Sequence, residues 1–352
     1  MRVFLVCPAP PRTRHGNRVT ALRWADILRR LGCRVTVAEG YDGRTCELLI
    51  ALHARKSAAA IEKFHALHPD RPAIVALTGT DLYRDLGRSR RARRAVALAT
   101  RLIVLQPLGI QRLPLPLRPK ARVIYQSSQK LRPRPRRSRA AFEVTVIGHL
   151  RPEKDPMRPA LAARRLPPVS RIRILHVGKA MTPVLEKRAR AEMARNPRYR
   201  WLGDRTRAET RAILARSRLM VLPSRIEGGA NVVSEAVAAS VPVLASRIPG
   251  SVGLLGAGYP GLFEPGDARG LSSLLWRAES DRTFYRRLAR ACAEQAALFE
   301  PARELAAWRA LLVELRRTAR AGAPQPGADG QENPTSAHRR RGRVGAPSAP
   351  RR

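Results

Sequence analysis

Cysteine is scarce in this sequence of 352 residues, and the four cysteines lie far apart. Cys7, Cys33, Cys46 and Cys292 include no C-x-x-C pair, and no histidine cluster accompanies them at the spacing of a zinc site. The pattern therefore excludes a disulfide framework and predicts no metal site. It is typical of a protein of the reducing cytoplasm, where we expect this chain to function.

Long apolar runs are also missing. The apolar run at the N-terminus ends at Pro8 after about five residues, which is too short for the core of a signal peptide. No later stretch approaches the roughly 18 apolar residues that a membrane span needs. We therefore expect a soluble chain with no membrane span, long enough for two domains that each bury a core.

Acidic and aromatic residues are few. The chain has 68 Lys and Arg against 27 Asp and Glu, a net charge of +41 that favours anionic partners. Aromatic residues make up only 5%, so the stacking platforms of single-strand nucleic-acid binders are not apparent, and no RNP or zinc-finger pattern is present. We expect solvated arginines, anionic ligands in one cleft and no specific nucleic-acid partner. A protein that binds nucleic acid or an anionic surface is the alternative from another class.

Short apolar runs alternate with helical patterns along most of the chain. The strands predicted in the first half are 2–7, 34–39, 47–52, 73–77 and 101–105, and those in the second half are 142–150, 171–178, 199–204, 218–224, 241–246 and 261–266. Such alternation predicts an α/β protein with parallel sheets covered by helices on both faces.

A basic, proline-containing stretch without apolar periodicity separates the two α/β halves. We expect an N-terminal domain over 1–127, a linker over 128–141 and a C-terminal domain over 142–300. A final helix over 301–319 would precede a tail at 320–352, whose Pro, Gly, Ala and Arg content predicts disorder.

Two glutamates flank a glycine turn that follows an apolar strand. Glu227 precedes Gly228 and Gly229, and Glu235 lies in the helix predicted over 232–239. The unpaired amides of such a helix start can bind an anion, and a carboxylate one or two turns further can accept ribose hydroxyls. Alternatively, Glu235 is a solvated helix residue and the glycines only form a turn.

The loop at 148–156, GHLRPEKDP, follows the first strand of the same half and carries Arg151 and Lys154. In open α/β sheets, ligands bind beyond the carboxyl ends of the strands. Both loops can therefore face one cleft.

This layout resembles that of the retaining GT-B glycosyltransferases of family four. The resemblance implies two Rossmann-like domains facing a central cleft, with a nucleotide-sugar donor on the C-terminal domain and an acceptor mainly on the N-terminal domain. It also implies that Glu235 binds the ribose hydroxyls and that Glu227 binds hydroxyls of the donor sugar. The other implied donor-binding residues are Gly16, His149, Arg151, Lys154, Gly228, Gly229, Asn231 and Val232.

The sequence departs from this family in the donor loops. His149 stands where the family has an arginine, with Arg151 as a possible substitute, and Gly16-Asn17 replaces a glycine pair. No D-x-D motif is present, so cationic side chains and helix amides must stabilise the departing UDP without a metal or other cofactor.

Longer strings, among them GTDLYRDL at 79–86 and SRIEGGANVVSEA at 224–236, resemble the selenosugar synthases of selenoneine biosynthesis over about residues 1–315. The resemblance implies that selenophosphate displaces UDP from a UDP-sugar, typically UDP-N-acetylglucosamine. The products would be a 1-selenosugar, UDP and phosphate. An ordinary glycosyltransferase acting on a hydroxyl acceptor is the alternative with the same fold.

Three loops at predicted strand ends of the first half carry candidate acceptor residues. Selenophosphate is a small polyanion with a soft nucleophile, so its site needs cations and amides more than a strong general base. The acceptor-binding candidates are Asn17, Arg18, Arg55, Lys56, Gly79 and Thr80. With Glu227, we expect His53 and Asp81 at the catalytic centre, although His53 could be a core residue and Asp81 a helix cap.

Overall fold

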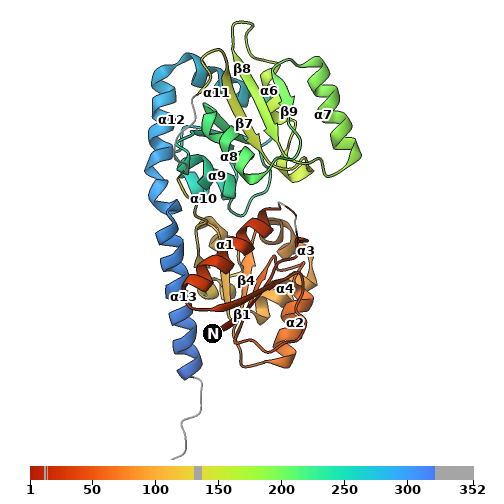
Figure 1. Cartoon of the computed structure of the whole chain (residues 1–352), viewed down its shortest axis with the longest axis vertical. Coiled ribbons are helices and arrows are strands. Elements are labelled where there is room, and N and C mark those ends of the chain that lie inside the picture. The colour runs from red at the N-terminus through yellow and green to blue at the C-terminus, as the bar shows by residue number, and fades with distance from the viewer. Residues whose placement is uncertain (12, 14, 131–136, 322–352) are drawn as a thin grey trace, which may run out of the picture.

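Two six-stranded parallel sheets, one in each half of the chain, form the framework of the computed structural model (Figure 1). The structure describes residues 1–11, 13, 15–130 and 137–321, with the side chains of 318–321 excepted. The predicted tail over 320–352 lies outside the described residues from 322 onward, and part of the predicted linker does too. The α/β class predicted from the alternation of patterns is confirmed.

The N-terminal half orders its strands β2-β1-β3-β4-β5-β6. They are β1 (Arg2–Val6), β2 (Arg34–Ala38), β3 (Leu48–Leu52), β4 (Ala73–Leu77), β5 (Arg101–Val104) and β6 (Ala121–Val123). The helices are α1 (Gly16–Arg30), α2 (Ala58–Leu67), the π-helix η1 (Asp81–Asp85), α3 (Leu86–Arg88), α4 (Arg90–Leu98), α5 (Leu108–Gln111) and the 3₁₀ segment η2 (Leu115–Lys120). The sequence predicted five of these strands and missed β6, whose three residues are too short for a periodicity to appear.

The C-terminal half orders its strands β12-β11-β10-β7-β8-β9. They are β7 (Phe142–Ile147), β8 (Ile172–Val177), β9 (Tyr199–Trp201), β10 (Leu219–Leu222), β11 (Val243–Ser246) and β12 (Leu262–Phe263). The helices are η3 (Pro152–Lys154), α6 (Arg158–Ala163), α7 (Pro183–Arg195), α8 (Arg207–Arg216), α9 (Asn231–Ala238), α10 (Pro249–Leu255), α11 (Ala268–Ser280), α12 (Arg282–Glu294), η4 (Ala296–Phe299) and α13 (Pro301–Ala321).

Both faces of the N-terminal sheet are buried, which explains its continuous apolar strands. Along β1, Val3 and Leu5 face a core shared with α1 and α13, whereas Phe4 and Val6 face a core shared with α2 and α4. Successive side chains of a strand point to opposite faces, so a helical layer covers each side of the sheet.

The last helix, α13, runs along the N-terminal half (Figure 1). Its residue Trp308 is fully buried and meets the Trp24 ring of α1 edge to face, with 5.0 Å between ring centroids. Leu311, Leu312 and Leu315 enter the same core. The structure describes this helix as far as Ala321, two residues beyond its predicted end at 319.

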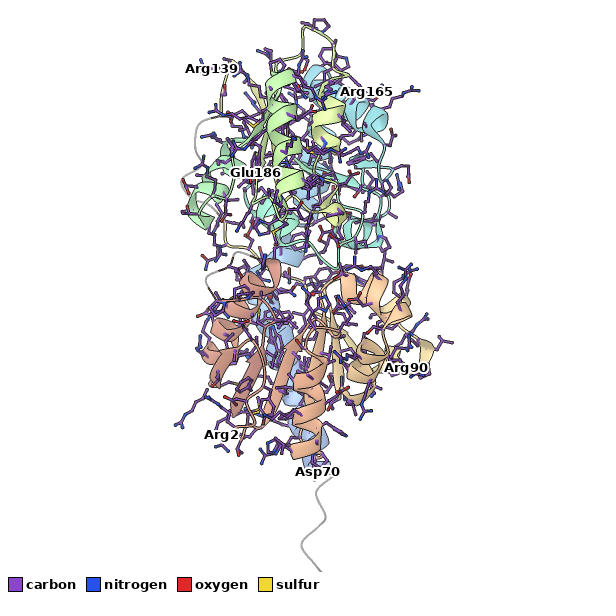
Figure 2. The ribbon with its side chains drawn as sticks, turned by 90° about the vertical axis from the view of Figure 1, so that its right-hand side faces the viewer. Arg2, Asp70, Arg90, Arg139, Arg165 and Glu186 are labelled. Carbon is purple, nitrogen blue, oxygen red and sulfur yellow. The ribbon has the colours of Figure 1, made fainter. Side chains whose placement is uncertain are left out.

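Charged side chains cover the outside of both halves (Figure 2). Arg2, Asp70 and Arg90 lie on the N-terminal half, and Arg139, Arg165 and Glu186 lie on the C-terminal half. Within the described part of the chain, no helix is both long enough and apolar enough to cross a membrane.

Candidate active site

The loops at the carboxyl ends of the two sheets meet each other. In the C-terminal sheet the strand order reverses between β7 and β10, the point where open α/β sheets bind ligands. The loops that follow these strands carry Lys154 and Glu227, respectively. Opposite them lies the loop after β4, where a Cβ on Gly228 would stand 2.5 Å from the Thr78 carbonyl carbon. Gly228 is therefore required for the close approach of the two backbones, a role that the sequence motif did not indicate.

Glu227 and Lys154 form an ion pair in this structure. The Glu227 side chain is buried, and the Lys154 side chain is about one-fifth exposed. The two loops predicted to face one cleft therefore bring their charged residues into direct contact.

The first turn of helix α9 follows directly after the loop that carries Glu227. Its N-cap, Ala230, makes no side-chain capping bond, so the helix start keeps amides that an anion can use. One turn beyond Asn231 lies Glu235, and burial raises the pKa of its carboxyl. Arg207, Arg211 and Arg23 act against this rise, so the carboxyl lies in a cationic surrounding.

The side chain of Asn231 is bound by the other half of the molecule. Arg23 donates from Nη1 to Asn231 Oδ1 at 2.9 Å, and Asn231 Nδ2 donates to Thr20 Oγ1 at 3.3 Å. Both partners lie on α1. Arg23 was not predicted, because it reads in sequence as one of many solvated arginines.

His149 lies against His15 of the other half, with their rings edge to face and 5.3 Å between centroids. The Lys179 amide donates to His149 Nδ1 at 3.1 Å. Burial lowers the pKa of His149 to about 4, so this ring is neutral at pH 7. The ring therefore carries no positive charge, and the cationic side chains of this loop are those of Lys154 and the exposed Arg151.

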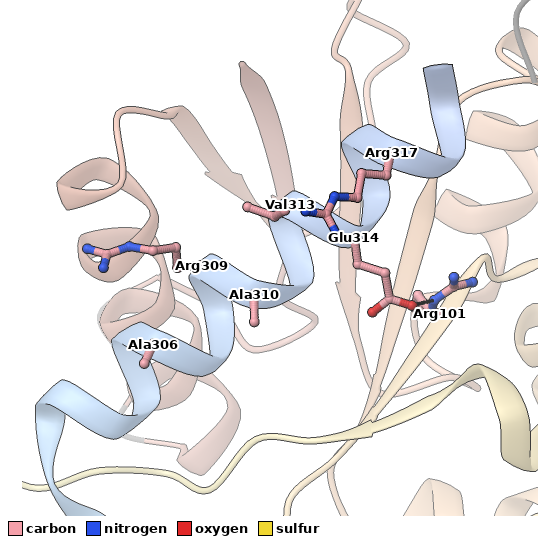
Figure 3. A pocket seen from close by; sticks show the side chains of 7 residues that line it. All are labelled: Arg101, Ala306, Arg309, Ala310, Val313, Glu314 and Arg317. Atoms are coloured by element: carbon pink, nitrogen blue, oxygen red, sulfur yellow. Dashed lines mark hydrogen bonds and ion pairs between the residues drawn. The ribbon is translucent and has the colours of Figure 1, made fainter. Parts of the chain in front are cut away.

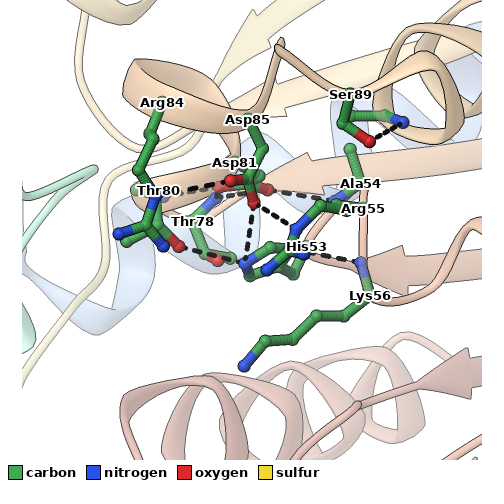
Figure 4. Close-up of polar contacts among 12 residues, drawn as sticks. His53, Ala54, Arg55, Lys56, Thr78, Thr80, Asp81, Arg84, Asp85 and Ser89 are labelled. Atoms are coloured by element: carbon green, nitrogen blue, oxygen red, sulfur yellow. Dashed lines mark hydrogen bonds and ion pairs between the residues drawn. The ribbon is translucent and has the colours of Figure 1, made fainter.

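His53, at the end of β3, has a left-handed backbone with φ of 71° (Figure 4). Its Nδ1 accepts a bond from the Lys56 amide at 3.4 Å, so we infer that Nε2 carries the proton. Nε2 lies 3.0 Å from Thr80 Oγ1, to which it donates. Burial lowers the pKa of His53, which favours this neutral form.

Asp81 lies beneath the acceptor loops instead of facing the cleft. Its side chain is fully buried, and its oxygens accept from the amides of Thr78, Gly79 and Ala54 at 2.8 to 3.2 Å. The carboxylate thus holds the ends of β3 and β4 together. This placement differs from the expected catalytic position and makes Asp81 a positioning residue.

The remaining acceptor candidates occupy the rim of the same region. Arg55 donates to Asp85 at 2.8 Å, and Lys56 is exposed. Arg18 is half-buried in the first turn of α1 and contacts the thiol of Cys7, whose pKa is raised by burial. Gly16 begins α1, with open space where a side chain would lie.

A groove elsewhere on the molecule contains none of the predicted site residues (Figure 3). It lies beside α13, has a volume of about 570 Å³ and includes the ion pair between Arg101 and Glu314. Among the residues that the structure describes, no group of three or more His, Cys, Asp and Glu side chains could hold a metal ion.

A scan against protein families finds one match that spans the C-terminal half. Residues 127–297 match the family described as Glycosyl transferases group 1. This part of the chain, which carries both glutamates and Lys154, is therefore similar to that family. No curated protein matches the sequence.

Solved structures extend the likeness to the whole fold. Anabaena Alr3699/HepE in complex with UDP-glucose has a TM-score of 0.70 at 17% identity, over 90% of this chain and 100% of that chain. Sucrose-phosphate synthase from Thermosynechococcus elongatus has a TM-score of 0.69 at 15% identity, over 90% and 99%. A glycosyltransferase from Rickettsia africae has a TM-score of 0.66 at 13% identity, over 90% and 98%. The chain has the GT-B fold, as predicted.

A buried histidine supports the loops of the C-terminal half. His176 Nε2 donates to the Gly148 carbonyl at 3.2 Å, and Nδ1 accepts from the Tyr199 hydroxyl at 3.1 Å. Complete burial lowers its pKa to about 4 from a usual value of 6.5. A proton on Nδ1 would remove the acceptor for Tyr199 and place a charge in the core.

We predict that His176→Gln reduces the pH dependence of stability. As the pH falls below 6.5, unfolded His176 binds a proton and folded His176 does not, so the free energy of unfolding decreases until about pH 4. Between pH 7 and pH 5 this histidine contributes a loss of about 2 kcal/mol. Urea denaturation at both pH values measures the loss, and an equal loss in the variant would contradict the assignment.

Proposed function

We propose that this chain transfers the sugar of a UDP-sugar, UDP-N-acetylglucosamine in particular, to selenophosphate and so forms a carbon–selenium bond. The sequence resemblance to selenosugar synthases favours this acceptor. The donor class is supported by the group 1 glycosyltransferase match and by HepE, a protein of the same fold solved with UDP and with UDP-glucose. Transfer to a hydroxyl acceptor is the alternative that the tests below distinguish.

The donor would bind across α9 and the loop after β7. Glu235 accepts the two ribose hydroxyls, and the first amides of α9, from Asn231 and Val232, meet the diphosphate. Lys154 moves from Glu227 to the diphosphate, which leaves Glu227 to bind hydroxyls of the sugar. The bound donor thus replaces an ion pair that already exists in the protein.

The choice of acceptor rests on the three side chains opposite the donor that could act as a general base. Each of them already has a hydrogen-bond or ion-pair partner. The contact of the Lys56 amide with Nδ1 favours a proton on Nε2 of His53, Asp81 accepts from three backbone amides, and Asp85 is paired with Arg55. None of these three groups is placed to take a proton from a sugar or lipid hydroxyl. Selenophosphate needs no such base, because its selenium is already a nucleophile.

The proposed reaction balances without a metal or redox partner. Selenium attacks C1 of the sugar, and the C1–O bond to UDP breaks with its electron pair leaving on the β-phosphate. Water then attacks phosphorus, the P–Se bond breaks, and the products are phosphate and the selenol of the sugar. Lys154 and the α9 amides stabilise the charge that develops on UDP.

We predict that the full-length protein converts UDP-N-acetylglucosamine and selenophosphate to a 1-selenosugar, with one UDP released per product. Mass spectrometry identifies the product, and thiophosphate in a parallel reaction should give the 1-thiosugar, because it has the same charge and shape. Release of UDP with hydroxyl acceptors only would instead establish an ordinary glycosyltransferase.

We predict that Glu235→Ala weakens UDP binding about 10- to 150-fold, because hydrogen bonds to a charged group contribute roughly 1.5–3 kcal/mol. Calorimetry with UDP measures the change without turnover. Glu186→Ala is the matched control, since the half-exposed Glu186 lies on α7 and pairs with Arg190 four positions away. Unchanged affinity in a folded Glu235 variant would remove this residue from the donor site.

We predict that Arg18→Ala and Lys56→Gln raise the KM for selenophosphate while the KM for the UDP-sugar stays nearly constant. Each lost contact to the anion should lower kcat/KM about 10- to 150-fold if the side chain binds it directly. Lys63→Gln is the control, because Lys63 lies on α2 and donates to the Asp42 carbonyl. A fall in kcat/KM that is equal for the two substrates would contradict an acceptor role.

A further inference from the structure

An ion pair joins the two halves at the rim of the candidate site. Arg84 of the π-helix η1 donates from Nη1 to Glu153 Oε1 at 2.9 Å. Glu153 belongs to η3, in the loop after β7. Their side chains are 38% and 21% exposed, so the pair is partly shielded from water. The contact raises the pKa of Arg84, as expected for a real ion pair.

On the acceptor side, Arg84 ends a short series of charged contacts (Figure 4). Its Nε lies 3.4 Å from Asp85, which also receives Arg55 at 2.8 Å and lies 3.9 Å from His53 Nε2. A shift of η1 would therefore move Asp85, and with it the side chains that surround His53. π-Helices of this length are rare and occur often at functional sites.

On the donor side, Glu153 is fixed to the loop that follows β10. Its carbonyl accepts from the Arg225 amide at 2.8 Å, and the next residue, Lys154, pairs with Glu227. Through Glu153, Arg84 thus contacts the backbone segment that carries Lys154. This is the lysine proposed to bind the diphosphate.

We propose that Arg84 and Glu153 form a latch that holds the two sides of the cleft in register. The pair sets the position of the Lys154 loop against His53, so both members are positioning residues that touch neither substrate. The use of turnover as a readout rests on the proposed function, whereas the latch itself is a property of the protein without substrates.

A double-mutant cycle with Arg84→Gln, Glu153→Gln and the double variant tests the latch. Each single change should lower kcat/KM for the UDP-sugar about 2- to 5-fold, the range of a partly exposed ion pair. The kcat/KM of the double variant should be no lower than that of the less active single variant, because both changes remove the same interaction. Exchange of the charges, Arg84→Glu with Glu153→Arg, should restore part of the loss.

Arg88→Gln is the matched control, since it removes an exposed arginine four positions from Arg84. In 1 M salt the wild-type protein should approach the variants, because screening weakens the pair, while the variants should change less. Additive losses in the double variant, or losses equal to that of Arg88→Gln, would overturn the latch.

A readout without turnover separates this proposal from the proposed function. Small-angle scattering of the full chain should give a larger radius of gyration for Arg84→Gln and Glu153→Gln than for wild type and Arg88→Gln. If the wild-type protein shows no transferase activity, this difference still supports the latch. If the radii of all four proteins agree, the latch is overturned, whatever the activity.

Discussion

A buried carboxylate on the last helix, Glu304, holds together the segments on which the facing sheets depend. It is fully enclosed and accepts from Trp24 Nε1 and the Ser127 amide, both at 2.8 Å, and pairs with Arg23 at 3.0 Å. A buried charge is tolerated only when its oxygens are satisfied in this way, so loss of one partner is strongly destabilising. Trp24 lies on α1, and Ser127 lies where the chain leaves the N-terminal sheet. The network therefore joins α13 and α1 to the segment that leaves the N-terminal sheet, and Arg23 extends it to Asn231 at the start of α9.

The charges at the ends of the N-terminal strands are partly neutralised by neighbouring groups. On the acceptor side, Asp81 is saturated by amides and Asp85 by arginines, whereas Lys56 is exposed. With these two acids paired and Lys56 exposed, the region carries positive charge that can attract anions. The surplus of 41 positive charges thus has a local counterpart at the strand ends, and the expectation that anionic ligands occupy one cleft stays a prediction.

The sequence was sufficient to predict the fold and the loops of the site. Apolar periodicity located eleven of the twelve strands in the described part of the chain. Ligands of open α/β sheets bind where such strands end, so Glu227 and Lys154 could be expected in one place. Roles that depend on tertiary partners could not be predicted. Nothing in the string GTDLYRDL reveals that Asp81 accepts from amides of two loops, or that Arg84 reaches Glu153 69 positions away. A single sequence also gives no reason to expect His15 beside His149.

Under the proposed function, the ion pair between Lys154 and Glu227 gives both charged side chains a partner before the donor binds. Each residue satisfies the other while no ligand is bound, which avoids the cost of an isolated buried charge. A nucleotide sugar can replace both partners of this ion pair, because its diphosphate can bind Lys154 while its sugar hydroxyls bind Glu227. Free UDP has only the diphosphate, so its binding to Lys154 would leave the buried Glu227 without a cation. Under the proposed function, this difference makes the intact donor a better fit than UDP alone, and it favours release of UDP once the sugar has been transferred.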